Sequence, residues 1–298
     1  MILGRRADGY HEVRTVLQTV SLHDQLHFSS RDDSEIVLSC DDSSIPHGAE
    51  NLVTQAASAL RAHCGVALGA TIHLQKRIPV QAGLGGASSN AAVTLLGLAR
   101  LWQLQMGVVE LTRIGTRLGA DVPFFFWGGC ALATGIGADV TPLSDTPLKH
   151  LLILKPGAAV ATADAYRALS ARALTTSEDA SILSVSCAEP DFDRLDQRAL
   201  QNDFEPAIFA AQPEIENARR ALIESGAVGA MLAGSGSCVF GIFDNKHAQQ
   251  SALQEIRADA GWKIFSAVTM SRQEYLLALG SGEGALLRSV SVGPDTGA

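Results

Sequence analysis

The chain has 298 residues, of which 47% are hydrophobic and 18% charged, and its formal net charge at pH 7 is -8. This length suffices for one large domain or two smaller ones with a substantial core. The acidic balance argues against a nucleic-acid partner, because the average surface would repel a polyanion, so any phosphate must be held by a local device.

The first half is expected to open with a polar loop, GRRADGYHE at residues 4–12. Strands are then predicted at 13–22, 25–29, 35–39 and 70–75. Helices are predicted at 51–63, 88–104 and 109–118. The clearest of these signals are the strict alternation of apolar and polar residues over 70–75 and the helical spacing of apolar residues over 88–104.

A Pro-containing loop at 141–149 is the expected domain boundary, because a new strand begins after it. Strands are predicted beyond it at 151–155, 229–232, 238–243 and 263–268. Helices are predicted at 162–169, 198–210, 214–225 and 246–259. This alternation favours a two-layer α+β sandwich. Residues 175–191 are polar and weakly patterned, and the Gly- and Ser-rich tail from Gly280 is expected to be disordered.

The five cysteines are widely spaced and form no CxxC pair. This usage favours reduced thiols and argues against a disulfide framework or a zinc site. The first residues lack the apolar core of a signal peptide, and no apolar run approaches the length of a membrane span. We therefore expect a cytoplasmic protein that does not bind membranes, while monomer and homodimer both stay open.

Residues 79–92, PVQAGLGGASSNAA, carry the strongest local signal. Their glycines allow a tight turn and a close approach of the backbone to a ligand, and Ser88 and Ser89 are of a type that begins helices. Free N–H groups at the positive end of a helix dipole form an anion site, most naturally for phosphate. A glycine turn capped by a serine is the alternative interpretation.

Two familiar nucleotide motifs are excluded by pattern. No Gly-Lys pair exists to complete GxxxxGK[ST], and Ser88 occupies the last glycine position of GxGxxG.

Residues 79–92 resemble the second motif of the GHMP kinases, PxxxGLGSSAA in general form, and the variant GLGGASSNAA is similar to that of the 4-diphosphocytidyl-2-C-methyl-D-erythritol kinases. Three further segments match in the same order. RADGYH at 6–11 resembles the substrate loop of those kinases, GADVP at 119–123 the segment with their catalytic aspartate, and GSG at 234–236 their third motif. The matches span most of the chain, and RADGYH together with GLGGASSNAA is a specific signal.

The resemblance implies an α+β protein with the GHMP kinase fold. It implies an N-terminal ATP-binding domain over 1–145 like domain 2 of ribosomal protein S5, a ferredoxin-like C-terminal domain over 146–280, and a disordered tail over 281–298. The chain departs from the relatives in two respects. Ala87 stands where a third glycine is usual, and only three residues precede Gly4, so the relatives' first strand and its lysine are expected to be missing from this sequence.

The resemblance also implies an ATP-dependent phosphotransferase that acts on the 2-hydroxyl of 4-diphosphocytidyl-2-C-methyl-D-erythritol in isoprenoid precursor synthesis. ATP and Mg²⁺ are implied with it, although no carboxylate cluster in the sequence marks a metal site. Another GHMP kinase activity, on homoserine, mevalonate or a sugar, is disfavoured by RADGYH, because those substrates offer no base for stacking. A ligand-binding relative without the chemistry stays open, because the lysine is missing.

Site residues follow from the same resemblance. Asp121 is implied to accept the proton of the substrate hydroxyl, with a structural helix cap before Pro123 as the alternative. ATP is implied to contact Pro79, Val80, Gln81, Ala82, Gly83, Leu84, Gly85, Gly86, Ala87, Ser88, Ser89, Asn51 and Lys76. The substrate is implied to contact Tyr10, His11, Tyr166, Thr162, Gly234 and Gly236.

Tyr10 is implied to stack on the cytosine, His11 to hydrogen-bond its edge and Tyr166 to close the other face. Stacking is worth roughly 1–3 kcal/mol per base. Tyr166 packed on the core, and Lys76 as an ordinary strand-end lysine, are the alternatives. His23 and His27 lie four residues apart in an extended segment, too far to share a metal ion easily, so they are expected on the surface.

Overall fold

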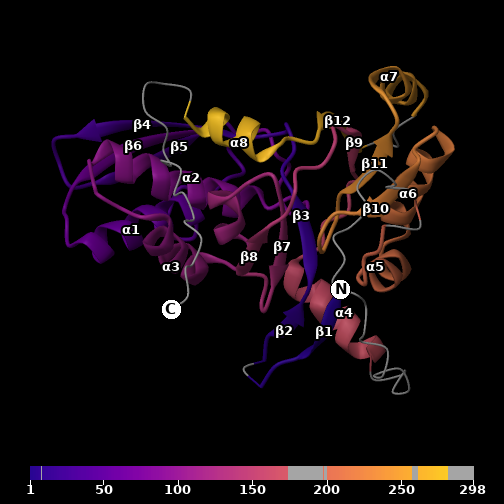
Figure 1. The fold of residues 1–298 in the computed structure, drawn as a ribbon, viewed down its shortest axis with the longest axis horizontal. Coiled ribbons are helices and arrows are strands. Elements are labelled where there is room, and N and C mark those ends of the chain that lie inside the picture. Colours follow the sequence, from indigo (N-terminus) through magenta and orange to yellow (C-terminus); the bar gives the residue numbers. More distant parts are fainter. Residues whose placement is uncertain (8, 174–196, 198–199, 257–260, 281–298) are drawn as a thin grey trace, which may run out of the picture.

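The computed structural model describes the chain except residues 8, 174–196, 198–199, 257–260 and 281–298 (Figure 1). The first half contains β1 (Ile2–Arg5), β2 (His11–Val13), β3 (Thr15–Gln18), β4 (Gln25–Arg31), β5 (Ile36–Cys40), α1 (Leu52–Cys64), β6 (Gly69–Gln75), α2 (Gly86–Leu101), α3 (Val108–Leu118), the 3-10 helix η1 (Val122–Phe126), β7 (Cys130–Thr134) and β8 (Asp139–Pro142). The second half contains β9 (His150–Lys155), α4 (Thr162–Ala173), α5 (Glu205–Ala211), α6 (Pro213–Glu224), β10 (Gly229–Leu232), β11 (Val239–Phe243), α7 (Lys246–Glu255), β12 (Lys263–Val268) and α8 (Arg272–Leu279).

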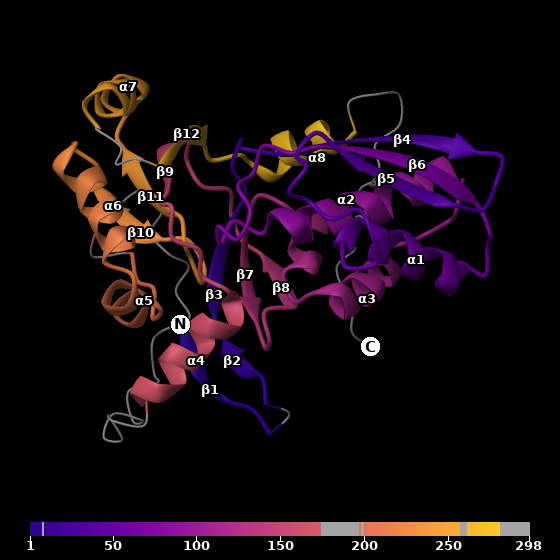
Figure 2. The same cartoon turned by 180° about the vertical axis from the view of Figure 1, so that it is seen from behind.

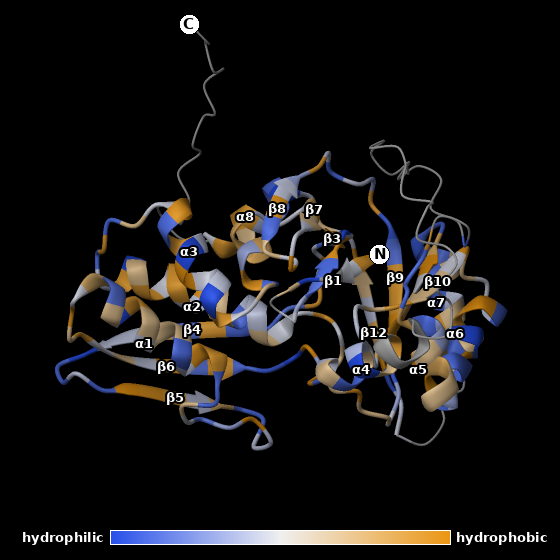
Figure 3. Ribbon diagram, turned by 90° about the horizontal axis from the view of Figure 1, so that it is seen from below, coloured by the Kyte–Doolittle hydropathy of each residue, from blue (hydrophilic) through white to orange (hydrophobic). Residues whose placement is uncertain are grey.

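One layer of the first half is the sheet β4-β6-β5, in which β4 is antiparallel and β5 parallel to β6. Helices α1 and α2 pack on one face of this sheet, with α3 beside them (Figure 3). The predicted alternation of β6 is confirmed, because Ala70, Ile72 and Leu74 are buried against the helices while the residues between them are half-exposed. Asn51 caps α1, and Gly65 in the left-handed conformation ends it.

The second half is built on the antiparallel sheet β10-β11-β9-β12. Helices α5, α6 and α7 cover one face, where Leu152 and Leu154 of β9 are buried. The opposite face, with Leu151 and Ile153, packs against Ala82 and neighbouring residues of the first half. Strand β9 is therefore buried on both faces, which explains its uninterrupted apolar run. The glycine segment thus lies directly against the C-terminal sheet.

The predicted α+β class and the order of most elements are confirmed. The predicted polar loop at 4–12 is wrong at its ends, because β1 and β2 pair as a hairpin across it. The predicted strand 13–22 is broken into β2 and β3, with only an isolated bridge from Val20 to Thr269 beyond them. Strands β7 and β8 and helix α8 were not predicted, although Ser271 and Glu274 form a capping box at the start of α8.

The helix predicted at 198–210 begins only at Glu205. The side chain of Asn202 explains this late start, because its Oδ1 accepts from Phe204 N while its Nδ2 donates to the carbonyl oxygens of Leu232 and Gly234. Tertiary hydrogen bonds thus replace helical ones before Glu205. The polar stretch 175–191, the tail 281–298 and the last residues of the helix predicted at 246–259 lie outside the described residues.

Candidate active site

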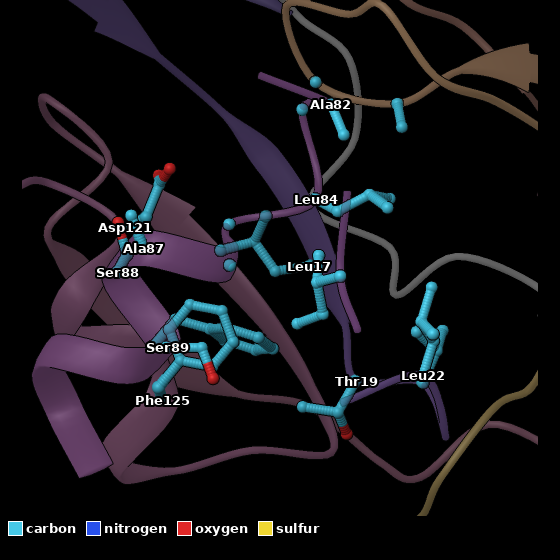
Figure 4. A pocket seen from close by; sticks show the side chains of 18 of the residues that line it. Leu17, Thr19, Leu22, Ala82, Leu84, Ala87, Ser88, Ser89, Asp121 and Phe125 are labelled. Carbon is cyan, nitrogen blue, oxygen red and sulfur yellow. The ribbon is translucent and has the colours of Figure 1, made fainter. Parts of the chain in front are cut away.

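A pocket of about 1940 Å³ lies between the two halves of the chain. Strand β3, the glycine segment 79–89, Asp121 and the residues around 232–235 all contribute to its lining. Figure 4 shows Asp121, Ala87 and Ser88 together on one side, and Leu17, Thr19 and Leu22 along β3 and the segment that follows it. In the part of the sheet that the structure describes, β3 is an edge strand, and all four of its residues line the pocket.

The glycine segment leads straight into α2. Its N-cap is Gly85, which lies in the left-handed region with φ 67° and offers no side chain to cap the helix. Ser88 is inside the helix, which starts two residues before the predicted position, so the alternative of a serine cap is wrong. The first N–H groups of a helix have no intrahelical acceptor, and here they begin at a residue that lines the pocket. The segment therefore offers an anion site at a helix N-terminus.

Asn51 and Lys76, predicted beside the nucleotide, also line this pocket. Asn51 caps α1 through its Oδ1 and donates from Nδ2 to the carbonyl of Pro46. The Lys76 side chain is 9% exposed, and its ammonium donates to Asp24 Oδ2 at 2.8 Å and to the carbonyl of Ile78. Lys76 is therefore a partly buried ion-pair partner beneath the glycine segment.

Asp121 lies in the turn before η1, at the N-cap position, but makes no capping hydrogen bond to that helix. The structural-cap alternative therefore finds no support. Asp121 is exposed where it lines the pocket, and the pocket walls displace part of the water around its carboxyl group. This desolvation raises the pKa of the Asp121 carboxyl above its ordinary value. A carboxylate with a raised pKa and access to a ligand fits the role of a general base.

Phe125 connects the Asp121 segment with the glycine segment, and the sequence interpretation did not identify it. A Cβ placed on Gly85 would lie 2.9 Å from the end of the Phe125 ring, so the two segments touch here (Figure 4). The backbone of Phe125 is held from the far end of the chain, because Tyr275 of α8 donates from its hydroxyl to the Phe125 carbonyl at 2.7 Å.

The predicted substrate residues fall into two groups, the aromatic residues Tyr10, His11 and Tyr166 and the residues Thr162, Gly234 and Gly236. His11 of β2 stacks on Tyr166 of α4, with ring centroids 4.8 Å apart, and Tyr166 in turn meets the edge of Phe204 at 5.0 Å. The two views agree that α4 runs beside the β1–β2 hairpin (Figures 1 and 2). Tyr166 lines the pocket, whereas Tyr10 is 62% exposed outside its lining. Burial, followed by the charge of Asp121, raises the pKa of the Tyr166 hydroxyl above its ordinary value.

Thr162 and Gly234 approach the pocket from the second half. The hydroxyls of Thr162 and Ser235 lie 3.1 Å apart, so α4 and the 234–236 turn are joined at the lining. The same turn packs on the glycine segment, with Ser237 N donating to the Gln81 carbonyl and Cys238 N to that of Ala82. Gly236, the last residue of this turn, lies close to the Leu232 side chain and is not part of the pocket lining.

The remaining sequence interpretations concern metals, thiols and membranes. His23 and His27 are exposed, as predicted. The described residues contain no group of three or more His, Cys, Asp or Glu side chains arranged to hold a metal ion. Cys40, Cys64 and Cys238 are free thiols. No helix in the described ranges is both long and apolar enough to span a membrane.

Comparison with known proteins gives consistent matches. The family model for the GHMP kinases N terminal domain matches residues 51–129, and that for GHMP kinases C terminal matches 184–260. The chain is 38% identical to 4-diphosphocytidyl-2-C-methyl-D-erythritol kinase of Alkaliphilus metalliredigens, over 86% of this chain and 87% of that protein. It is 39% identical to the protein of the same name from Geobacter sp. strain M21, over 88% and 91%. A crystal structure of 4-(cytidine 5'-diphospho)-2C-methyl-D-erythritol kinase superposes with a TM-score of 0.75 at 33% identity, covering 90% of this chain and 94% of that one.

Proposed function

The chain belongs to the GHMP kinase family and, within it, to the 4-diphosphocytidyl-2-C-methyl-D-erythritol kinases; on this premise we propose that it transfers the terminal phosphoryl group of ATP to the 2-hydroxyl of 4-diphosphocytidyl-2-C-methyl-D-erythritol, in isoprenoid precursor synthesis. The observation that carries the proposal is the juxtaposition in one pocket of a carboxylate at Asp121 and an uncapped helix N-terminus at Gly85.

ATP phosphates are proposed to lie against the N-terminus of α2. The helix dipole and the N–H groups that follow Gly85 would stabilise their negative charge, which the acidic protein surface would otherwise disfavour. Residues 79–89 and Asn51 supply the surrounding wall, and Lys76 lies beneath it. The role of these residues is to bind and orient the nucleotide, which is most of what a protein contributes to phosphoryl transfer.

Asp121 is proposed as the general base. Its carboxylate takes the proton of the substrate hydroxyl while that oxygen forms a bond to the γ-phosphorus, and the bond from the γ-phosphorus to the bridging oxygen breaks to release ADP. The raised pKa of Asp121 makes the carboxylate a better proton acceptor than an ordinary aspartate.

The cytidyl group is proposed to bind next to His11 and Tyr166, with Tyr10 closing over it from the exposed turn. The stacked His11–Tyr166 pair lies between the N-terminal hairpin and α4 and provides aromatic faces and a hydrogen-bonding edge. Thr162 and Gly234 would then line the path of the sugar alcohol toward Asp121.

Mg²⁺ is proposed to accompany ATP. The donor chemistry fits, because Ser88 lines the pocket beside the proposed phosphate position and Mg²⁺ bound with a nucleotide takes most of its ligands from phosphate oxygens and water. Ser88 is the side chain that would hold it, while Asp121 stays free of the ion to act as the base. When bound, the ion would neutralise charge on the phosphates.

A turnover assay tests the proposal. Purified protein with ATP and Mg²⁺ is offered the cytidyl substrate, homoserine or mevalonate, and ADP and the phosphate ester are quantified together. We expect ADP and ester in equal amounts with the cytidyl substrate alone. Calorimetric binding of ATP and the cytidyl substrate without any turnover would instead favour the ligand-binding alternative.

A further inference from the structure

Asp24, between β3 and β4, is a buried carboxylate that the sequence interpretation did not single out. Its side chain is 1% exposed. Oδ1 accepts from the backbone N–H groups of Arg77 and Ile78, both at 2.7 Å. Oδ2 accepts from Lys76 Nζ at 2.8 Å and from Asn90 Nδ2 at 2.9 Å. A charge this deeply buried is tolerated only because donors surround both of its oxygens.

The donors come from the two ends of the glycine segment. Lys76, Arg77 and Ile78 follow β6 and lead into residues 79–89, while Asn90 belongs to the first turns of α2, directly after them. One carboxylate therefore joins the entering and the leaving stem of the segment. Asn90 is itself only 4% exposed, so this tie is not a surface contact that water could replace.

Asp24 also fixes the Lys76 ammonium. Two of its three N–H donors are directed to Asp24 and to the Ile78 carbonyl. A Cβ placed on Gly86, the first residue of α2, would lie 3.5 Å from Lys76 Nζ. The cation is thus held directly under the helix N-terminus, where phosphates are proposed to bind.

We propose that Asp24 is a positioning residue for the nucleotide: by tying both stems of residues 79–89 and holding Lys76 under α2, it sets the direction of the N–H groups that receive the phosphates. This inference rests on the proposed function, since it names a further residue of the same site. Asp24 acts through the glycine segment and Lys76, so the loss of its carboxylate weakens the binding of ATP and not that of the cytidyl substrate.

The test is Asp24→Asn, which keeps the shape of the side chain but presents a donor to Lys76. Binding of ADP and of ATP is measured by calorimetry without the cytidyl substrate, and KM is measured for both substrates. We expect the Kd of both nucleotides to rise about 10- to 100-fold, as for loss of a charged hydrogen-bond partner. The KM of the cytidyl substrate is expected to stay within about two-fold. Lys76→Met is expected to weaken ADP binding as well. The effects of Asp24→Asn and Lys76→Met on the Kd of ADP should be non-additive in the double variant.

Glu214→Gln is the matched control. The Glu214 carboxylate accepts from Gly157 N, Ala158 N and Trp262 Nε1, all in the second half of the chain. The Glu214→Gln variant should have a lower Tm than the wild type and an unchanged Kd for ADP. If Asp24→Asn lowers Tm similarly and binds ADP like the wild type, Asp24 is only structural and the inference is overturned.

Two further outcomes are informative. Should Asp24→Asn fail to fold, Asn90→Ala removes one donor of the same carboxylate, and an unchanged Kd for ADP there overturns the inference equally. Should the wild type bind no nucleotide, the proposed function itself fails, and this result is distinct from a failure of the inference about Asp24.

Discussion

At the scale of single residues, the proposed mechanism depends most on the Asp121 carboxylate. Asp121 is open to the pocket but desolvated, so its pKa is raised. A carboxyl whose folded-state pKa exceeds its unfolded value contributes stability below the unfolded pKa, and this contribution is lost as pH rises through the folded pKa. At neutral pH the charged form of Asp121 therefore costs stability, as is common for catalytic groups.

Asp121→Asn is expected to lower kcat by about 10²–10⁴-fold, the usual contribution of a general base. Because the variant also removes a desolvated charge, its Tm at pH 7 should equal or exceed that of the wild type. The Tm difference should vanish as the pH is lowered below the ordinary aspartate range. Near-normal turnover of the folded variant would contradict the assignment of the base.

At the scale of elements, the glycine segment serves two purposes. Gly85 starts α2 without a cap and approaches Phe125, whereas Gly83 makes room for the second half of the chain. A Cβ on Gly83, whose φ is 71°, would lie 1.9 Å from the carbonyl oxygen of Ala233. The clash at Gly83 is with backbone, and that at Gly85 is with the far end of a side chain.

Gly83→Ala should therefore be more destabilising than Gly85→Ala. Both positions have positive φ, which costs a non-glycine residue roughly 1–2 kcal/mol. Gly83→Ala must in addition displace the turn at 233–236, so we expect a lower denaturation midpoint and weaker binding of both substrates. Urea denaturation and calorimetry of the two variants check this. Equal stability of the two variants would show that the turn at 233–236 shifts away from an added Cβ at little cost in free energy.

At the scale of the whole molecule, segments from the beginning and the end of the described chain meet around the pocket. His11 comes from the N-terminal hairpin, Tyr166 from α4, and the backbone next to Phe125 is held by Tyr275 of α8. Helix α8 follows the last strand of the C-terminal sheet and returns to the first half (Figure 1). The proposed boundaries at 145 and 280 thus divide the sequence, while the pocket is shared.

Tyr166→Ala is expected to weaken the binding of the cytidyl substrate selectively. Loss of one stacking surface should raise its Kd by about 5- to 100-fold, from roughly 1–3 kcal/mol per base, and leave the Kd of ADP within about two-fold. Tyr166→Phe, which keeps the ring, serves as the control and should bind the substrate nearly as well as the wild type. A Kd for ADP that rises as much as that of the cytidyl substrate would identify Tyr166 as a core residue instead.

The sequence by itself determined the α+β class, most strands and helices, and the segments that are proposed to carry the chemistry, because periodicity, glycine turns and short motifs are local properties. Local information did not predict that Asn202 delays the start of α5, that Gly83 accommodates Ala233, or that Asp24 accepts from four donors. These partners are 30 to 150 residues away or unremarkable in sequence, and only packing brings them together. Tertiary structure decides them because a buried polar group or a missing Cβ has meaning only against the atoms that surround it.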